Sequence, residues 1–238
     1  MGAALLAVGK TAAPPPTPAS APVVLELFTS QGCSSCPPAD TLLSELAKSP
    51  DVLALSFHVD YWDYLGWKDA WSAPEWSARQ RTYARVLGDG GRVYTPQLVV
   101  NGKAGVLGSS RSQAERAIAA ARTAPRVAIE ATVTPAKSGG WTVTASVAAS
   151  PRPLLVEALL LESGLVTDVR DGENAGRTMR NDGVVRRRVD VGETSAGAAW
   201  SGSAAIPASA SKGPRRIAIL ARDAETLQIA GVAVQSAE

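Results

Sequence analysis

The segment VVLELFTSQGCSSCPPAD, residues 23–40, determines the fold that we expect for this chain. Its first part, residues 23–29, is an apolar run typical of a buried strand. A short turn leads to Cys33 and Cys36, which stand at the start of a helical stretch at residues 38–48. A Cys-x-x-Cys pair at a strand-to-helix junction is typical of a reactive dithiol, because a helix N-terminus favours the thiolate and lowers the pKa of the first cysteine.

The chain has 238 residues and two cysteines, so any disulfide within one chain must join this pair. A bridge that closes so few residues restricts the unfolded chain little and is a poor staple for a fold. We therefore interpret the pair as a redox-active dithiol. A passive disulfide and a metal site are the two alternatives.

Composition argues against several classes of function. The 24 basic and 22 acidic residues are scattered and give a net charge of +2, with no basic tract of the kind that follows a phosphate backbone, so we expect no nucleic-acid binding. No stretch reaches 18 uninterrupted apolar residues, so we expect no integral membrane span. The chain has one histidine, and any catalytic triad or histidine-containing metal site must include His58.

Residues 1–22 indicate export. A short apolar run at residues 3–8 precedes a stretch at residues 11–22 that is rich in Pro, Ala, Ser and Thr and cannot pack a core. We interpret the segment as a signal-peptide remnant and linker, which predicts a periplasmic or secreted protein. The alternative is a disordered tail on a cytosolic protein.

Strands and helices alternate between residues 23 and 124. After the first strand and helix, the periodicity predicts a strand at 52–61, a helix at 74–87, strands at 97–100 and 104–107, and a helix at 112–122. Asn101-Gly102 is a hairpin signal, so the two short strands should pair antiparallel.

This order of elements, with Cys-x-x-Cys after the first strand, resembles the thioredoxin fold. The resemblance implies a cis peptide bond at Thr95-Pro96 that faces the dithiol, with the Thr95 backbone holding an incoming peptide. It also implies that Glu26, a carboxylate within a buried strand, passes a proton to Cys36 and has a pKa raised by desolvation. The alternatives are a trans proline that starts a strand and an edge-strand glutamate that faces water.

A closer resemblance is to a bacterial family of predicted secreted proteins of unknown function with thioredoxin-like folds. It rests on LFTSQGCSSCPPAD at residues 27–40, HVDYWDYLGW at 58–67, YTPQ at 94–97 and RDGENAGR at 170–177. The resemblance covers nearly the whole chain after residue 22. It implies the fold and export, but no activity, because the family has no assigned one.

The second half of the chain has a different pattern. Short alternating or apolar runs, separated by Gly, Pro and Ser, predict an antiparallel β-sandwich, with strands at 126–134, 141–148, 154–161, 184–191, 198–206 and 215–221. Residues 164–183 should form a polar loop. Its polar residues Arg170, Glu173, Asn174 and Arg177 either contact the first domain, by docking on it or by flanking the dithiol, or face solvent. The expected fold class is thus an α/β thioredoxin-like domain (23–124), a mixed sheet with flanking helices, followed by an antiparallel β-sandwich domain (125–238).

The aromatic segment after the second strand has two interpretations. Its four tryptophans either line a binding surface beside the cysteines or anchor a long insertion by packing, which is more common: Trp62, Trp67, Trp71 and Trp76. His58 could complete a copper(I) site with Cys33 and Cys36, since soft ligands suit this ion. A hydrogen-bonded structural histidine is the more common alternative.

The leading hypothesis is thiol–disulfide exchange with protein thiols or disulfides outside the cytoplasm, without a cofactor. Cys33 would attack and Cys36 would resolve the mixed disulfide. Glu26 would assist proton transfer, and Thr95-Pro96 would position the substrate. A copper(I)-handling module and a redox-sensing adaptor without turnover are the alternatives, and oligomeric state does not follow from the sequence.

Overall fold

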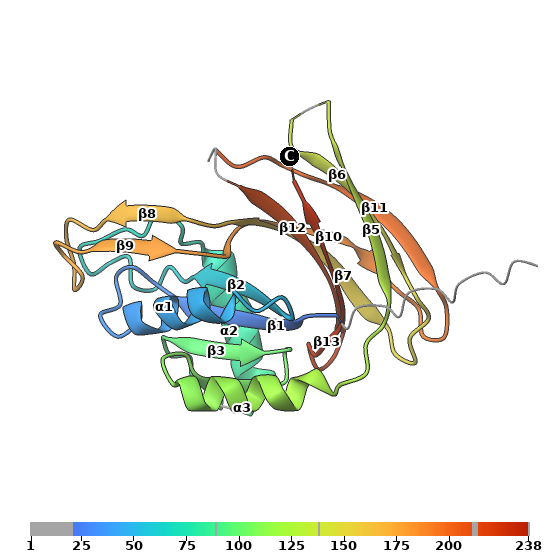
Figure 1. Ribbon diagram of the computed structural model, residues 1–238, viewed down its shortest axis with the longest axis horizontal. Helices are drawn as coiled ribbons and strands as arrows, with labels where there is room; N and C mark the ends of the chain where they lie inside the picture. Colours follow the sequence, from blue (N-terminus) through green and yellow to red (C-terminus); the bar gives the residue numbers. More distant parts are fainter. Residues whose placement is uncertain (1–20, 89, 138, 211–213, 238) are drawn as a thin grey trace, which may run out of the picture.

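An eight-stranded mixed sheet forms the centre of the computed structural model, which describes residues 21–88, 90–137, 139–210 and 214–237 (Figure 1). Its strands are β1 (Val23–Thr29), β2 (Val52–His58), β3 (Gln97–Val100), β4 (Ala104–Leu107), β7 (Leu154–Glu162), β10 (Val184–Glu193), β12 (Arg215–Asp223) and β13 (Ile229–Ser236). They lie in the order β13-β12-β7-β10-β2-β1-β3-β4. The sheet is mixed because β1 pairs parallel with β2 and antiparallel with β3.

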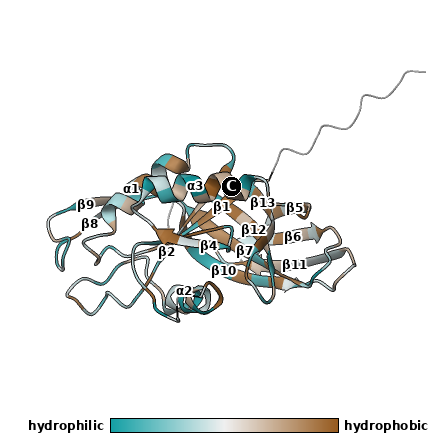
Figure 2. Cartoon of the chain, turned by 90° about the horizontal axis from the view of Figure 1, so that it is seen from below, coloured by the Kyte–Doolittle hydropathy of each residue, from teal (hydrophilic) through white to brown (hydrophobic). Residues whose placement is uncertain are grey.

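Helices cover both faces of the sheet around β1 and β2. They are α1 (Pro37–Leu46), α2 (Pro74–Val86) and α3 (Arg111–Arg122). Figure 2 shows α1 and α3 on one side of the sheet and α2 on the other. This double cover explains why every residue of β1 and β2 is buried, and it confirms a mixed α/β fold.

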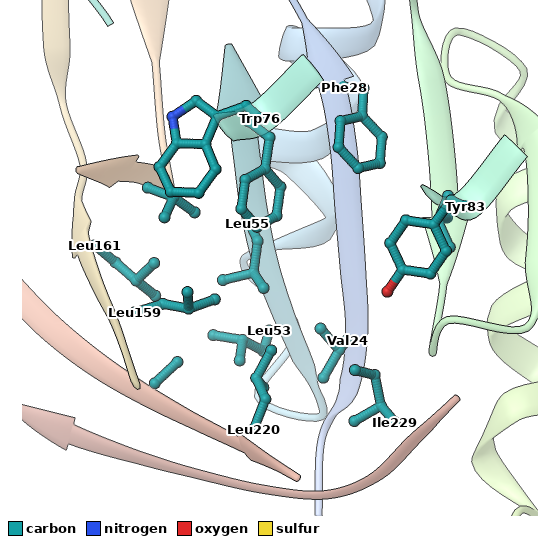
Figure 3. Packing of buried hydrophobic residues seen from close by; sticks show 14 of the residues in the cluster. Val24, Phe28, Leu53, Leu55, Trp76, Tyr83, Leu159, Leu161, Leu220 and Ile229 are labelled. Atoms are coloured by element: carbon teal, nitrogen blue, oxygen red, sulfur yellow. The ribbon is translucent and has the colours of Figure 1, made fainter. Parts of the chain in front are cut away.

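Alternation along β1 divides its side chains between two cores. Leu25 and Leu27 pack with α1 and α3, whereas Val24 and Phe28 pack with α2. The core on the α2 side extends to β7 and β12, and Figure 3 shows leucines of these strands beside Leu53 of β2. This core therefore joins the two halves of the chain.

The second half of the chain forms two packed layers. One layer is a three-stranded sheet, and the other is part of the eight-stranded sheet. The three-stranded sheet is antiparallel, in the order β11-β6-β5, and consists of β5 (Ile129–Pro135), β6 (Trp141–Val147) and β11 (Trp200–Ile206). It packs its apolar side chains against β7 and β12. The expectation of a β-sandwich with two sheets of its own is corrected, because β7, β10, β12 and β13 extend the sheet of the first half.

The junction between the halves is the parallel pairing of β10 with β2. Val184 is in register with Ser56, and the Ser56 N–H donates to the Gly183 carbonyl at 2.8 Å. Gly183 has a φ of +64°, and a Cβ there would lie 2.4 Å from the Ala54 carbonyl oxygen. A glycine is needed for this close approach. Without this pairing, the backbone hydrogen-bonding groups on that edge of β2 would lack a neighbouring strand.

A two-stranded hairpin occupies the segment that we expected to be an irregular polar loop. Its strands are β8 (Leu165–Asp168) and β9 (Thr178–Asn181), joined by residues 169–177. The strands are short and mostly polar, which explains why alternation did not reveal them. Figure 1 shows the hairpin beside α1, at the end of the molecule far from the three-stranded sheet.

The segment interpreted as a signal-peptide remnant and linker lies outside the described residues, except for Ala21 and Pro22. Within the described ranges, no helix has both the length and the apolar character that crossing a membrane requires. Export remains a prediction from the sequence.

Candidate functional site

A disulfide joins Cys33 and Cys36 between β1 and α1. The two Cα atoms are 5.4 Å apart. Both cysteines have an exposed fraction of 0%, whereas Ser34 and Ser35 between them are exposed. The disulfide therefore lies just beneath the surface but is closed to solvent.

Hydroxyl groups surround the sulfur of Cys33. The Thr95 hydroxyl donates to Cys33 Sγ at 3.4 Å, and the Ser35 hydroxyl lies 3.3 Å from the same atom. The Thr95-Pro96 peptide bond is cis, and Trp62 Nε1 donates to Thr95 Oγ1 at 2.8 Å. Because hydrogen bonds to a thiolate favour its charged form, the two hydroxyls can lower the pKa of Cys33 once the disulfide is reduced.

The amides of α1 contribute less to this site than we expected from the sequence. Cys36 is the N-cap of the helix, and Pro37 and Pro38, which follow it, have no N–H. The amides of the next two residues both donate to the Cys36 carbonyl, at 2.8 and 3.1 Å. A Cys33 thiolate would therefore depend on the hydroxyls and on the helix dipole rather than on hydrogen bonds from the first turn of α1.

Gln31 connects the cysteine loop to its surroundings and is completely buried. Its backbone N–H donates to Asp69 at 2.8 Å, and its Oε1 accepts from Trp67 Nε1 at 3.2 Å. Its Nε2 donates to Thr167 at 3.0 Å and to Asn181 at 3.2 Å. Gln31 thus connects the cysteine loop to the segment after β2 and to the β8–β9 hairpin.

The loop between β8 and β9 contacts the cysteine loop directly. Glu173 Oε2 accepts from the Ser34 N–H at 2.9 Å, and this contact holds the pKa of Glu173 below its usual range. Asn174 Nδ2 donates to the carbonyls of Gln31 and Cys33, at 2.9 Å each. These two residues therefore flank the dithiol, one of the two alternatives that we considered.

Arg170 and Arg177 of the same loop lie elsewhere. They line an open depression together with Asp168, Gly176 and Thr178. Both arginines are exposed. Of the four polar residues that the sequence singled out in this segment, two flank the dithiol and two face solvent.

Glu26 does not lie where a proton relay to Cys36 would need it. The alternation of β1 points Glu26 toward α2, whereas α1 packs on the opposite face. Glu26 Oε1 lies 2.6 Å from Arg79 Nη2, and Tyr83 donates to its other oxygen. Glu26 is thus a buried partner of an ion pair, and the proton-transfer role that the resemblance implied is corrected.

A different carboxyl lies on the α1 side of the sheet. Asp40 is buried in the first turn of α1, near Thr29 at the end of β1 and His58 at the end of β2. Burial raises the pKa of Asp40 to about 7, although the charge of His58 opposes the shift. A side-chain hydrogen bond from Thr29 also opposes the shift. Among the described residues, His58 Nε2 has no hydrogen-bond partner.

The other ring nitrogen of His58 contacts a carboxylate. His58 Nδ1 lies 2.6 Å from Asp69 Oδ2, and both side chains are buried. Burial favours neutral imidazole, but the Asp69 carboxylate outweighs it, so the pKa of His58 is raised. Asp69, His58 and Asp40 thus form a buried polar cluster under the helix that carries Cys36.

Asp40 is the site residue that our sequence reasoning missed. It stands four residues after Cys36, so the two side chains share one face of α1. The signal was present in the pattern: a carboxylate occupies a helix face that also carries Leu43, a core residue.

His58 is the residue that, in the copper(I) alternative, joins Cys33 and Cys36 as a ligand. Among the described residues, no three His, Cys, Asp or Glu side chains gather in a way that could hold a metal ion. In this structure the two cysteines form a disulfide and His58 Nδ1 contacts Asp69, so the copper(I) alternative with Cys33, Cys36 and His58 gains no support here and stays a prediction for the reduced protein. His58 is the hydrogen-bonded structural histidine of the other interpretation.

The tryptophans act as anchors. Trp76 is part of the core on the α2 side, and Trp62 and Trp67 make the hydrogen bonds to Thr95 and Gln31 described above. The Trp71 ring packs under the Arg186 guanidinium, with 4.3 Å from its carbon to the ring centroid. These contacts favour the packing interpretation.

Comparisons with known proteins give a family but no activity. The model of the family described as "Protein of unknown function (DUF1223)" matches residues 24–222. The crystal structure of protein AGR_C_4864 from Agrobacterium tumefaciens matches with a TM-score of 0.71 and 31% sequence identity, and the match covers 92% of this chain and 95% of that chain. A search of curated proteins found no match.

A second solved structure is DesR, a β-glucosidase from Streptomyces venezuelae in complex with D-glucose. It matches with a TM-score of 0.25 and 18% identity, over 47% of this chain and 15% of that chain.

Proposed function

This chain belongs to the DUF1223 family of proteins of unknown function, and from that premise we propose that it carries out thiol–disulfide exchange with proteins outside the cytoplasm. The observation that carries the proposal is the Cys33–Cys36 disulfide between β1 and α1, with the Thr95 hydroxyl 3.4 Å from Cys33 Sγ. The arrangement of β1, α1, β2, α2, β3, β4 and α3 around it supports a thioredoxin-like interpretation of residues 23–124.

The reaction has two steps. In the reduced protein, the Cys33 thiolate attacks one sulfur of a partner disulfide, forms a mixed disulfide and releases the other partner sulfur as a thiolate. The Cys36 thiolate then attacks Cys33 Sγ, restores the Cys33–Cys36 bond and releases the second partner thiolate. Two electrons pass to the partner, and the reverse sequence oxidises a partner dithiol.

The second step requires Cys36 to lose its proton inside the protein. Asp40 is suited to accept it, because it is buried and shares a face of α1 with Cys36. Burial raises the pKa of Asp40 to about 7, which is close to an ordinary working pH. We assign to Asp40 the proton-accepting role that the sequence assigned to Glu26.

Asp40→Asn is expected to slow the resolution of the mixed disulfide by roughly 100-fold at pH 8, the lower end of what a positioned acid or base contributes. In the wild type the rate should rise with pH through about 7, the pKa of Asp40, and this inflection should be absent in the variant. Stopped-flow kinetics from pH 5.5 to 9 measure both effects.

The control is Glu45→Gln, which neutralises an exposed carboxylate on the same helix and should leave the profile unchanged. Asp40→Asn should also stabilise the fold at pH 7. A carboxyl with a folded-state pKa raised above 3.8 reduces stability as pH rises from its unfolded pKa to its folded pKa. An unchanged inflection near pH 7 in Asp40→Asn would assign that titration to another group.

The reduction potential of the Cys33–Cys36 pair tests the function itself. Equilibration with glutathione should give a value between about −270 and −120 mV, the range of dedicated exchange proteins. The same protein should also reduce or oxidise a protein substrate over several turnovers. A potential well below about −300 mV would show an inert bridge and would overturn the proposal.

A further inference from the structure

The disulfide cannot react in the conformation that the structure shows. Exchange requires a thiolate to reach one sulfur directly. Cys33 and Cys36 each have an exposed fraction of 0%, although Ser34 and Ser35 beside them are exposed. Segments that pack against the cysteine loop must therefore move before a partner can react.

One of these segments is the loop at residues 169–177, which reaches the cysteine loop from the second half of the chain. Its two attachments are the Glu173 carboxylate on the Ser34 N–H and the Asn174 amide on the Gln31 and Cys33 carbonyls. All three attachment points on the cysteine loop are backbone groups. They are therefore present whatever the redox state of the sulfurs.

The loop has the internal structure of a unit that can move as a whole. Val169 N–H donates to the Arg177 carbonyl at 2.9 Å, and Gly176 N–H donates to the Val169 carbonyl at 2.8 Å, so the loop is closed on itself. Its outer part packs on the segment after β2, where a Cβ at Gly172 would lie 3.0 Å from Trp67 Cβ. The loop is attached to a sheet of two strands and not to the central sheet.

Each of the two attachments has a feature that favours opening. Glu173 is exposed, so water competes for its contact with Ser34. Asn174 is completely buried, and its Oδ1 has no hydrogen-bond partner in the part of the chain that the structure describes. A buried acceptor without a partner is unfavourable, and opening the loop would hydrate it.

We propose that residues 169–177 form a lid over the disulfide, and that Glu173 and Asn174 determine which thiols and disulfides react with it. This inference rests on the proposed exchange function and adds its selectivity. The lid slows the reaction of small thiols, because they form no hydrogen bonds that replace those broken when the lid opens.

The kind of partner follows from the contacts that the lid makes. Glu173 supplies an acceptor to one backbone N–H, and Asn174 supplies donors to two backbone carbonyls. An extended polypeptide backbone offers the same groups, an acceptor C=O and donor N–H groups, along one edge. The favoured partner is therefore an extended segment of protein that carries a cysteine, and it replaces the lid as it binds.

Two lid variants and one matched control test this inference in the full chain. Glu173→Ala and Asn174→Ala should each increase the rate constant for reduction of the disulfide by dithiothreitol, by at least tenfold for Asn174→Ala. The control, Arg180→Ala, removes an exposed side chain of the same hairpin and should leave the rate constant unchanged. Forward and reverse rates should rise together, so the reduction potential should not change.

Hydrogen exchange supplies a readout that involves no thiol chemistry. The Ser34 N–H is bound by Glu173, so its exchange should accelerate in Glu173→Ala, an exposed position at which substitution leaves the core intact. In addition, an extended peptide that carries two cysteine thiols should reduce the Cys33–Cys36 disulfide of the wild type faster than dithiothreitol does, and this preference should shrink in both lid variants.

Rate constants for dithiothreitol that are unchanged in both variants would overturn the lid. The proposed function fails in a different way, through an inert potential or no turnover of a protein substrate. Faster reduction in the lid variants of a protein without turnover would keep the lid and remove the exchange function. Turnover by the wild type with no effect of either variant would keep the exchange function and remove the lid.

Discussion

Replacing Cys33 with Ser is expected to abolish exchange, with a loss of more than about 1,000-fold in the rate of substrate turnover. Cys33 is the sulfur that the Thr95 and Ser35 hydroxyls approach, so it is the cysteine best placed to react as a thiolate. Serine cannot replace it, because a hydroxyl forms no mixed disulfide. Turnover of a protein disulfide, followed spectroscopically, measures the loss.

Cys36→Ser should have a different outcome. The first step remains possible, so the partner should stay bound to Cys33 through a mixed disulfide that electrophoresis without reductant detects. The double variant, without either cysteine, should form no adduct. A trapped partner on Cys36 in the Cys33→Ser protein, with none in Cys36→Ser, would reverse the roles of the two cysteines.

Arg79→Met is expected to lower the free energy of unfolding by roughly 3–5 kcal/mol, the usual effect of removing one partner from a buried ion pair. Arg79 lies between Glu26 and Glu157, at 2.6 and 2.9 Å, and all three side chains are almost fully buried. Its loss leaves Glu26 without a cationic partner in the core on the α2 side. Urea denaturation at pH 7 measures the effect.

The matched control is Arg122→Met, which breaks an exposed ion pair with Asp51 and should change stability by less than about 1 kcal/mol. Arg79→Met should retain the reduction potential of the wild type, because the dithiol lies on the other face of the sheet. A loss of less than about 1 kcal/mol in Arg79→Met would show that the two glutamates find other partners.

The same network predicts a dependence of stability on pH. Burial alone would raise the pKa of Glu157, but Arg79 and Arg222 outweigh it and lower the pKa from 4.5 to about 2. A carboxyl with a depressed folded-state pKa stabilises the fold above its unfolded pKa, and this contribution is lost as pH falls toward about 2. The shift corresponds to roughly 3 kcal/mol. Stability should therefore fall between pH 5 and 2, and less steeply in Glu157→Gln.

Local sequence was enough to predict the elements of the first half and the position of the dithiol. The strands and helices between residues 23 and 122 lie close to where the periodicity placed them, because each buries its own apolar face. Pro37 and Pro38 confined the helix start to one place, and the helix begins there. These features depend on neighbouring residues in the chain, which is why one sequence reveals them.

Tertiary structure alone decided which polar groups meet at the site. Alternation placed Val24, Glu26 and Phe28 on one face of β1, but it could not say whether α1 or α2 covers that face. Glu26 therefore pairs with Arg79, and Asp40 occupies the side of the sheet beneath Cys36. The contact of Asn174 with Cys33 joins residues 141 positions apart, through a hairpin of short polar strands that leaves no periodic signal. Hydrophobic alternation selects the residues to be buried, whereas the partners of buried polar groups depend on the packing of distant segments.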